Sequence, residues 1–271
     1  MPVHLPDSLV QAVRDRKCIL FLGSGLSALA GYPNWSQLID RLVGEAKRRP
    51  RARLDGLDTI EARRDYFMLA EFARATLGNA EYARLMKEQL GAHAAATEAH
   101  RLIAATDYRG IITTNYDRLL ETTITQVRSW APTTFTHIDV HAMAQALFNP
   151  ELFIFKMHGD IQAPGSIILT ARDYDHMLLR SPHVRALLFV GYSLSDPDFN
   201  LILGELTLLF ENYVPPHFAL VPNPGAFEAD HLLERLNIEL LPYDPADNHR
   251  AVLEVLQELH DIAPAPLLAA A

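Results

Sequence analysis

Short continuous apolar runs alternate with segments of helical spacing along the chain. The first run, Cys18–Leu22, ends at Gly23, and an unbroken apolar run of this length is typical of a strand buried on both faces. Further on, Asn34 and Gln37 have the spacing of a capping box, and the apolar residues after them repeat at helical intervals. The pattern predicts a central parallel strand at 18–22 and a helix that begins near Trp35.

From residue 47 to about residue 106 no strand-like run occurs, whereas apolar residues repeat at helical spacing. This pattern predicts an all-helical insert at about residues 47–106. The insert begins with a basic cluster formed by Lys47, Arg48, Arg49, Arg51 and Arg53. Such a cluster is usually a solvated helix end, and the alternative is a docking point for an acidic partner or nucleic acid.

Beyond the insert, apolar runs again alternate with helical patterns. The predicted strands are 110–114, 152–157, 167–169, 187–190, 218–221 and 238–241, and the predicted helices are 119–127, 199–210, 229–236 and 251–259. Alternation of this kind implies right-handed crossovers and a parallel sheet with helices on both faces. The predicted fold class is therefore α/β and Rossmann-like, and the Ala/Pro-rich residues 263–271 are expected to be a frayed tail.

Composition narrows the class of protein. Hydrophobic residues make up 49% of the 271 residues and charged residues 21%, as in a folded globular protein. The net charge of −9 disfavours direct binding to nucleic acid or to a membrane surface. No apolar stretch approaches the roughly 18 residues of a membrane span, and residues 1–17 lack a signal-peptide core, so we expect a cytoplasmic protein. The single cysteine, Cys18, excludes an intrachain disulfide and a C-x-x-C zinc site.

The turn after the first strand has a phosphate-binding pattern. Residues 23–28, GSGLSA, fit G-x-G-x-x-G/A, in which glycines let backbone N–H groups approach a pyrophosphate. An ordinary dinucleotide-binding turn continues into a long helix, whereas GYP at residues 31–33 interrupts this one. The pattern keeps a phosphate cradle and weakens the case for hydride transfer. The alternative is a glycine turn that serves only packing.

Polar residues also follow the later predicted strands, at the edge where open α/β sheets bind ligands. Asn115 and Asp117 follow the strand at 110–114, and either could instead cap the next helix. His158 follows the strand at 152–157, where an imidazole could move a proton, although a histidine in such a place is more often structural.

Two later turns have similar alternatives. Ser193, two residues after Gly191, could meet phosphate or ribose, and Asn223 could hold a second ribose or a base, but each could be a plain turn residue. His137 and His141 are four residues apart without an evident third ligand, so no metal is expected.

Five ordered segments together resemble the sirtuin-like domains of bacterial defence proteins, whose members hydrolyse NAD. The segments are GSGLSALAGYPNW, IITTNYD, FKMHGD, ILTARDY and LLFVGYSLSDPDFN. The resemblance extends from about residue 19 to residue 223. It implies a single sirtuin-like domain over residues 1–271, with the helical insert in the place of the four-cysteine zinc ribbon of sirtuin deacylases.

The resemblance also implies a Rossmann-like NAD site without a metal. Asn115 and His158 would be the catalytic pair, and Asp117 would be a third catalytic residue, near the nicotinamide ribose, that stabilises the developing cation. The implied cofactor-binding residues are Gly23, Ser24, Gly25, Ser27, Pro33, Trp35, Thr114, Gly191, Ser193 and Asn223. Between Tyr174 and Leu187 the chain is shorter than is usual in the family.

The implied activity is hydrolysis of NAD to nicotinamide and ADP-ribose in anti-phage defence. The alternatives are an NAD-dependent protein deacylase and a nucleotide-binding sensor or scaffold without turnover. Because an unregulated NAD hydrolase would be toxic to its own cell, we expect a homo-oligomer or a separate activating protein partner. The arginine-rich residues 48–53 are the candidate contact.

Overall fold

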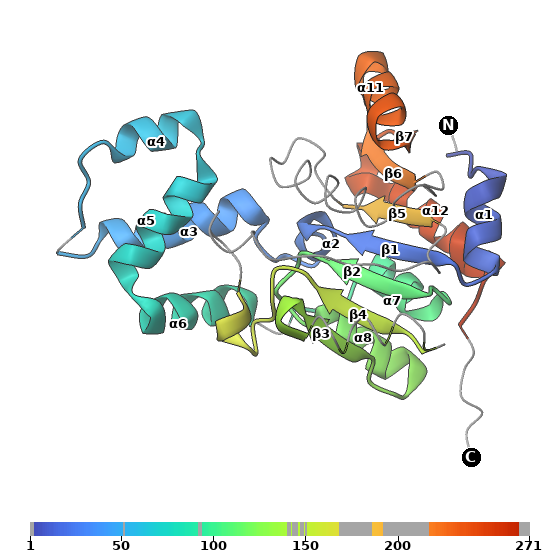
Figure 1. Cartoon of the computed structure of the whole chain (residues 1–271), viewed down its shortest axis with the longest axis horizontal. Helices are drawn as coiled ribbons and strands as arrows, with labels where there is room; N and C mark the ends of the chain where they lie inside the picture. The colour runs from blue at the N-terminus through green and yellow to red at the C-terminus, as the bar shows by residue number, and fades with distance from the viewer. Residues whose placement is uncertain are drawn as a thin grey trace.

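A computed structural model describes residues 3–50, 52–91, 94–139, 142, 146, 149, 151–167, 186–191 and 217–265. Its strands form one parallel sheet in the order β3-β4-β2-β1-β5-β6-β7 (Figure 1). The strands are β1 (Cys18–Leu22), β2 (Gly110–Thr113), β3 (Thr133–Thr136), β4 (Phe153–Lys156), β5 (Ala186–Val190), β6 (His217–Pro222) and β7 (Ile238–Tyr243). The predicted α/β fold with a parallel sheet is confirmed.

Helices precede, follow and connect these strands. They are α1 (Asp7–Arg14), α2 (Ser24–Ala28), α3 (Trp35–Lys47), α4 (Leu57–Arg63), α5 (Tyr66–Leu77), α6 (Asn79–Leu90), α7 (Glu98–Ala105), α8 (Leu119–Arg128), α11 (Ala226–Leu236) and α12 (Ala246–Ile262). The helix predicted at 199–210 lies outside the described residues. So does most of the strand predicted at 167–169, and Ile167 itself lies in no strand.

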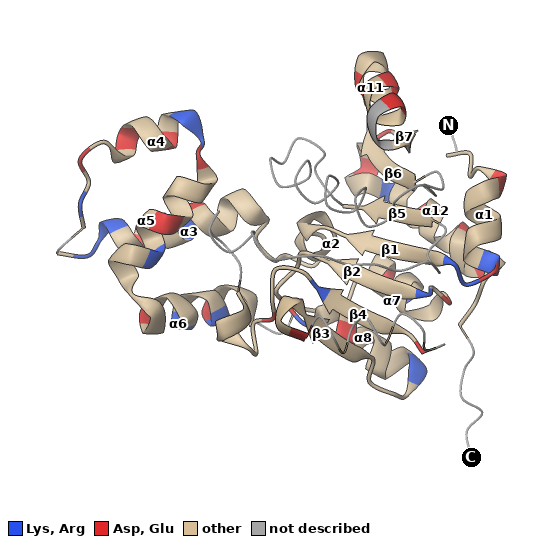
Figure 2. Ribbon diagram, viewed as in Figure 1, with Lys and Arg blue, Asp and Glu red and all other residues tan. Residues whose placement is uncertain are grey.

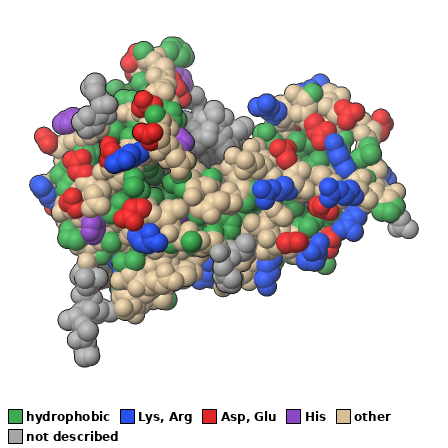
Figure 3. Space-filling model, turned by 180° about the vertical axis from the view of Figure 1, so that it is seen from behind, with side chains coloured by type: hydrophobic (Ala, Val, Ile, Leu, Met, Phe, Trp, Pro, Cys, Tyr) green, Lys and Arg blue, Asp and Glu red, His purple; other side chains and the backbone are tan. Residues whose placement is uncertain are grey.

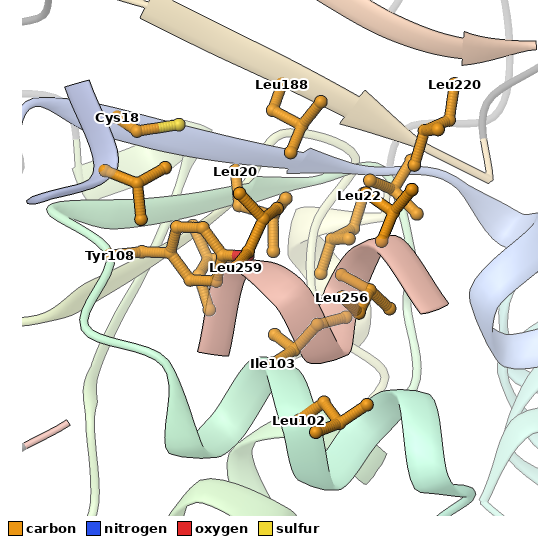
Figure 4. Packing of buried hydrophobic residues seen from close by; sticks show 14 of the residues in the cluster. Cys18, Leu20, Leu22, Leu102, Ile103, Tyr108, Leu188, Leu220, Leu256 and Leu259 are labelled. Carbon is orange, nitrogen blue, oxygen red and sulfur yellow. The ribbon is translucent and has the colours of Figure 1, made fainter. Parts of the chain in front are cut away.

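The strand β1 lies at the centre of the sheet, and its five residues are all buried. Alternate residues point to opposite faces, so one face packs Leu20 and Leu22 against α7 and α12, as Figure 4 shows. The other face packs Ile19 and Phe21 in a second cluster. Because β2 pairs with one edge of β1 and β5 with the other, the strand order reverses beside β1, and ligands bind at such a point in open α/β sheets.

The helical insert has its own core to one side of the sheet (Figure 1). Buried residues of α3, α4, α5 and α6 form this core, so α3 belongs with the insert, whereas α7 packs on the sheet. Two residues from loops at the sheet edge, Tyr116 and Ile161, are buried in the same core. The insert is therefore packed directly against the loops that follow β2 and β4.

Local sequence signals explain why α3 begins where it does. Asn34 Oδ1 accepts a hydrogen bond from the Gln37 N–H at 3.0 Å, and Gln37 Oε1 accepts one from the Asn34 N–H at 3.0 Å. The predicted capping box is confirmed. The edge strand β3 was not predicted, because three of its four residues are threonines and only one is buried.

The basic cluster at the start of the insert forms ion pairs within the insert. Lys47 pairs with Glu61 at 2.6 Å, Arg48 with Glu45, and Arg49 with Glu81. Lys and Arg side chains are interspersed with Asp and Glu over the insert (Figures 2 and 3). These pairs favour the interpretation of a solvated helix end. None of the helices in the described ranges is long and apolar enough for a membrane span.

Candidate functional site

A cavity of about 970 Å³ opens between the sheet edge and the insert. This volume is at the upper end of the range of small-molecule and cofactor sites, roughly 300–1,000 Å³. From the sheet side it is lined by Ser24, Gly25, Ser27, Ala28, Thr114, Asn115, Tyr116, Asp117, His158 and Gly191. From the segment that leads into the insert, and from the insert itself, it is lined by Tyr32, Pro33, Asn34, Trp35, Ser36, Leu38, Arg63, Arg64, Asp65, Tyr66, Phe67 and Leu90.

Glycines bring the turn after β1 against the end of β5. The Gly25 N–H donates to the Gly191 carbonyl at 2.9 Å, and a Cβ on Gly25 would lie 2.7 Å from that oxygen. The Gly23 N–H likewise donates to the Val190 carbonyl at 3.1 Å. Both amides therefore have protein partners already, and the packing alternative explains why glycine is needed at residue 25. Ser24 lines the cavity, and its predicted phosphate contact stays a prediction.

Asn115 is held in one orientation by its own amide group. Its Nδ2 donates to the Gly23 carbonyl at 3.0 Å and to Ser27 Oγ at 2.9 Å. Since a carbonyl can only accept, the amide nitrogen must be the atom that faces Gly23. The Oδ1 atom is buried and has no hydrogen-bond partner among the described residues. A buried acceptor left unpaired is costly, so this atom is the part of Asn115 that is available to a ligand or a water.

Asp117 supports Asn115 through Ser27. The Ser27 hydroxyl donates to Asp117 Oδ2 at 2.6 Å, and Asp117 Oδ1 accepts from the Leu119 N–H at 3.0 Å. A carboxylate only accepts, so the hydrogen bonds run from Asn115 through Ser27 to Asp117. Asp117 therefore does two things: it holds the start of the next helix, which was the alternative interpretation, and it also lines the cavity.

A buried lysine lies under the same turn. Lys156, at the end of β4, is 0% exposed, and its ammonium donates to the backbone carbonyls of Tyr116, at 3.1 Å, and of Asp117. It also lies 3.1 Å from Glu121 Oε1 and 3.2 Å from Asp160 Oδ2. Burial raises the pKa of Glu121, and the Lys156 charge opposes that rise. Lys156 thus ties the turn after β2 to the loop after β4.

His158 lines the cavity as a neutral imidazole. Its side chain is 6% exposed, and burial, followed by the nearby His137, lowers its pKa to about 3. At neutral pH the ring is unprotonated and can accept a proton. The neighbouring Gly159 has φ +91°, and a Cβ there would lie 2.0 Å from the Ser166 carbonyl, so glycine is required immediately after the histidine.

The structure brings most of the predicted site residues to this one cavity. Those that line it are Ser24, Gly25, Ser27, Pro33, Trp35, Thr114, Asn115, Asp117, His158 and Gly191. Gly23 contributes its carbonyl to Asn115. Asn223 follows β6 with φ 43° and is not among the lining residues. Ser193 lies outside the described residues.

Sequence reasoning missed several residues of the site. One of them is Lys156, which stands within the FKMHGD segment. A lysine between the apolar residues Phe155 and Met157, with a carboxylate four residues on, is a sequence signal for a buried ion pair. Arg63 and Arg64 lie in the insert without any local motif. Within the part of the chain that the structure describes, no group of three or more His, Cys, Asp or Glu side chains could hold a metal ion.

Comparison with known proteins shows what this chain is similar to. Residues 109–241 match the model of the SIR2-like domain. The chain is 26% identical over 277 residues to a protein named NAD(+) hydrolase ThsA from Bacillus cereus (strain MSX-D12), covering 92% of this chain and 55% of that protein. It is 27% identical over 252 residues to a protein of the same name from Cytobacillus dafuensis, covering 89% and 48%.

A third relative carries a sirtuin name. The chain is 22% identical over 280 residues to Defense-associated sirtuin 2 of Bacillus subtilis, covering 94% of this chain and 27% of that protein. The chain spans about half the length of the two NAD(+) hydrolases described above. The motif order, the parallel sheet and the matched family model agree. Residues 109–241 therefore match a SIR2-like domain, and the family resemblance that the five motifs predict is confirmed.

Proposed function

We propose that the chain hydrolyses NAD at the bond between nicotinamide and ribose, releasing nicotinamide, ADP-ribose and a proton. The observation that carries this proposal is that Asn115 and His158 line one cavity, where Asn115 has an unpartnered Oδ1 and His158 has a neutral ring. The names of the relatives support the same chemistry. NAD is the proposed substrate, and no metal is part of the proposal.

Cleavage of this bond passes through an oxocarbenium-like centre, so the site must hold the leaving group and position a water. The Asn115 Oδ1 can accept a hydrogen bond from that water or from the nicotinamide amide. Its position is fixed before the substrate arrives, because both hydrogens of its Nδ2 are already engaged. A preorganised acceptor of this kind requires little reorganisation during the reaction.

His158 is the proposed proton acceptor. Its low pKa makes it a weak base, but water that adds to an oxocarbenium carbon becomes strongly acidic and needs only a weak acceptor. The neutral ring also adds no positive charge beside the developing cation. A ribose hydroxyl is the other proton donor that the same ring could serve.

Asp117 acts mainly through other residues in this proposal. Both of its oxygens already accept hydrogen bonds, from Ser27 and from the Leu119 N–H. Its negative charge lines the cavity and favours a developing cation, while its hydrogen bond fixes Ser27 and thereby Asn115. We therefore treat Asp117 as a positioning residue.

The direct test is to incubate the purified chain with NAD and to resolve nicotinamide and ADP-ribose by chromatography. His158→Ala is expected to lower turnover about 10²- to 10⁴-fold, the usual contribution of a positioned proton acceptor. Binding of ADP-ribose should change little. His231→Ala is the matched control, because His231 is exposed on α11 and does not line the cavity.

Three results would contradict the proposal. The first is unchanged nicotinamide release from His158→Ala. The second is release that requires an acylated peptide, which would indicate a deacylase. The third is tight NAD binding without product, at dilute and at assembly-promoting protein concentrations, which would indicate a sensor or scaffold.

The biological setting is part of the same proposal. The sirtuin-like family and the name of the Bacillus subtilis relative support a role in bacterial defence. We propose a cytoplasmic enzyme that acts against phage and is switched on by self-assembly or by a partner protein. Size-exclusion chromatography with light scattering, run with and without NAD turnover, tests whether activity follows assembly.

A further inference from the structure

Two arginines of the insert line the cavity without an ion pair. Arg63 ends α4 and Arg64 follows it, and both are exposed side chains on the cavity wall. Their backbones take part in the hydrogen bonds at the end of α4, but within the described part of the chain neither guanidinium group has a hydrogen-bond or salt-bridge partner. In Figure 2 the end of α4 that is turned toward the sheet is coloured for Lys and Arg.

Several other basic side chains of the insert differ in this respect. Their carboxylate partners are Glu61 for Lys47, Glu45 for Arg48, Glu81 for Arg49, and Glu81 and Glu88 for Arg84. The cation of Arg63 in the last turn of α4 is favourable for the helix dipole. Arg64, however, adopts φ 53°, a left-handed conformation that usually favours glycine or asparagine at a helix end. Helix stability therefore does not explain an arginine at residue 64.

Three backbone donors of the glycine turn are already engaged by the protein itself. The N–H groups of Gly23, Gly25 and Leu26 donate to the carbonyls of Val190, Gly191 and Gly23 respectively. These three N–H groups are not available to a pyrophosphate near this turn, so donors from other parts of the cavity wall are needed as well. The guanidinium groups on the opposite wall carry donors in the fork geometry that suits phosphate oxygens.

The charge balance of the cavity also indicates that an anionic ligand would need Arg63 and Arg64. Among the described lining residues the cationic side chains are Arg63 and Arg64, and the anionic ones are Asp65 and Asp117. His158 is neutral at pH 7. Without the two arginines the cavity would be negative, in a chain whose net charge is already −9, and a pyrophosphate would be repelled.

We propose that Arg63 and Arg64 form a subsite that binds a phosphate group of the dinucleotide. The inference rests on the proposed function for the identity of the ligand. The phosphate could come from the pyrophosphate that NAD and NADP share, or from the 2′-phosphate that only NADP carries. The insert would then supply substrate recognition, and the sheet edge would supply the reacting groups.

The test measures binding by calorimetry, which needs no turnover. The ligands are ADP-ribose, ADP-ribose 2′-phosphate and adenosine. In the double variant Arg63→Ala/Arg64→Ala we expect the dissociation constant of ADP-ribose to rise roughly 10- to 100-fold, as for the loss of charged hydrogen bonds. Adenosine binding should stay within about twofold, because it has no phosphate, and the loss should shrink at high salt.

Arg53→Ala is the matched control, since Arg53 is exposed on the insert but does not line the cavity. It removes one charge and should leave every dissociation constant nearly unchanged. Arg63→Lys/Arg64→Lys keeps the charges and should recover part of the affinity. Circular dichroism of each variant verifies that the fold is retained.

The ligands separate the two sources of phosphate. An equal loss for ADP-ribose and its 2′-phosphate assigns the subsite to the pyrophosphate, and a loss confined to the 2′-phosphate assigns it to that group. Unchanged affinities, an equal loss for adenosine, or no binding of either phosphorylated ligand by the wild type would overturn the inference. If binding depends on the arginines but NAD is not cleaved, the proposed function fails and the subsite stands.

Discussion

The two walls of the cavity are built in different ways. On the sheet side, Asn115, Asp117 and Lys156 are linked by hydrogen bonds, and Lys156 is completely buried. On the insert side, Arg63 and Arg64 are exposed, and the neighbouring charges form surface ion pairs such as that between Lys47 and Glu61. The contrast fits different roles for the two walls. A buried polar network fixes reacting groups, whereas exposed cations can adapt to a ligand.

The largest expected effect concerns two lysines, Lys156 beneath the sheet side of the cavity and Lys47 on the insert. Lys156→Met would leave the carboxylates of Glu121 and Asp160 buried without their cation, which typically costs about 3–5 kcal/mol. Lys47→Met removes an ion pair whose side chains are about one-third exposed, and it should cost less than about 1 kcal/mol. Chemical denaturation of both variants measures the difference. Equal losses of unfolding free energy in the two variants would contradict the contrast between a buried polar network and exposed ion pairs.

The second prediction concerns acid stability of the sheet part. Burial lowers the pKa of His100 to about 4, of His158 to about 3 and of His217 to about 4. Between these values and the ordinary pKa near 6.5, the unfolded chain binds more protons than the folded one. Stability should therefore fall as pH falls from 6.5 to 4, by about 1.4 kcal/mol per pH unit for each histidine.

His217 offers a variant that isolates one of these protons. Its Nδ1 accepts a hydrogen bond from the Leu187 N–H at 3.3 Å, which requires that this nitrogen be unprotonated. His217→Gln keeps an acceptor but does not titrate. Urea denaturation at pH 7, 6 and 5 should show that the variant loses less stability on acidification than the wild type does. Identical pH slopes would rule out the buried neutral His217.

Local signals account for the parts of the fold that the sequence predicted. Cys18–Leu22 is an unbroken apolar run, and Asn34 and Gln37 form a capping pair within four residues, so neither needed long-range information. The edge strand Thr133–Thr136 carries no such signal because three of its four residues are threonines and only one residue is buried. The strand ends that place Asn115 and His158 in one crevice were predicted from the parallel topology.

The missed parts of the site depend on contacts distant in sequence. Ser27 and Asp117 are 90 residues apart, and no pattern shows that a hydroxyl of one turn bonds to a carboxylate of another. Gly25 fitted a phosphate motif, yet its amide is taken by Gly191, which a motif cannot reveal. Arg63 and Arg64 reach the cavity only because the insert packs beside the sheet edge.

A third prediction compares two glycines, one on each side. Gly25→Ala would place a methyl group 2.7 Å from the Gly191 carbonyl oxygen, and overpacking of this kind costs about 1–3 kcal/mol. Gly44→Ala lies within α3, where an added Cβ meets no atom within 4 Å, so it should stabilise by about 0.5–1 kcal/mol. Thermal unfolding should shift down for the first variant and up for the second. Shifts of the same sign would contradict the assignment of the β1 turn as a packing contact.

The smallest expected effect tests whether the insert opens independently of the sheet. Asn34→Ala removes the cap of α3 and should cost about 1 kcal/mol. If the insert opens alone, amide hydrogen exchange should accelerate about fivefold in α3 and stay unchanged in β1. Because Tyr116 is buried in the insert core and is the neighbour of Asn115 in the sequence, such opening would also loosen the turn that carries Asn115. Equal acceleration in α3 and β1 would instead show that the insert and the sheet unfold as one cooperative unit. The two walls of the cavity would then have the same free energy of opening.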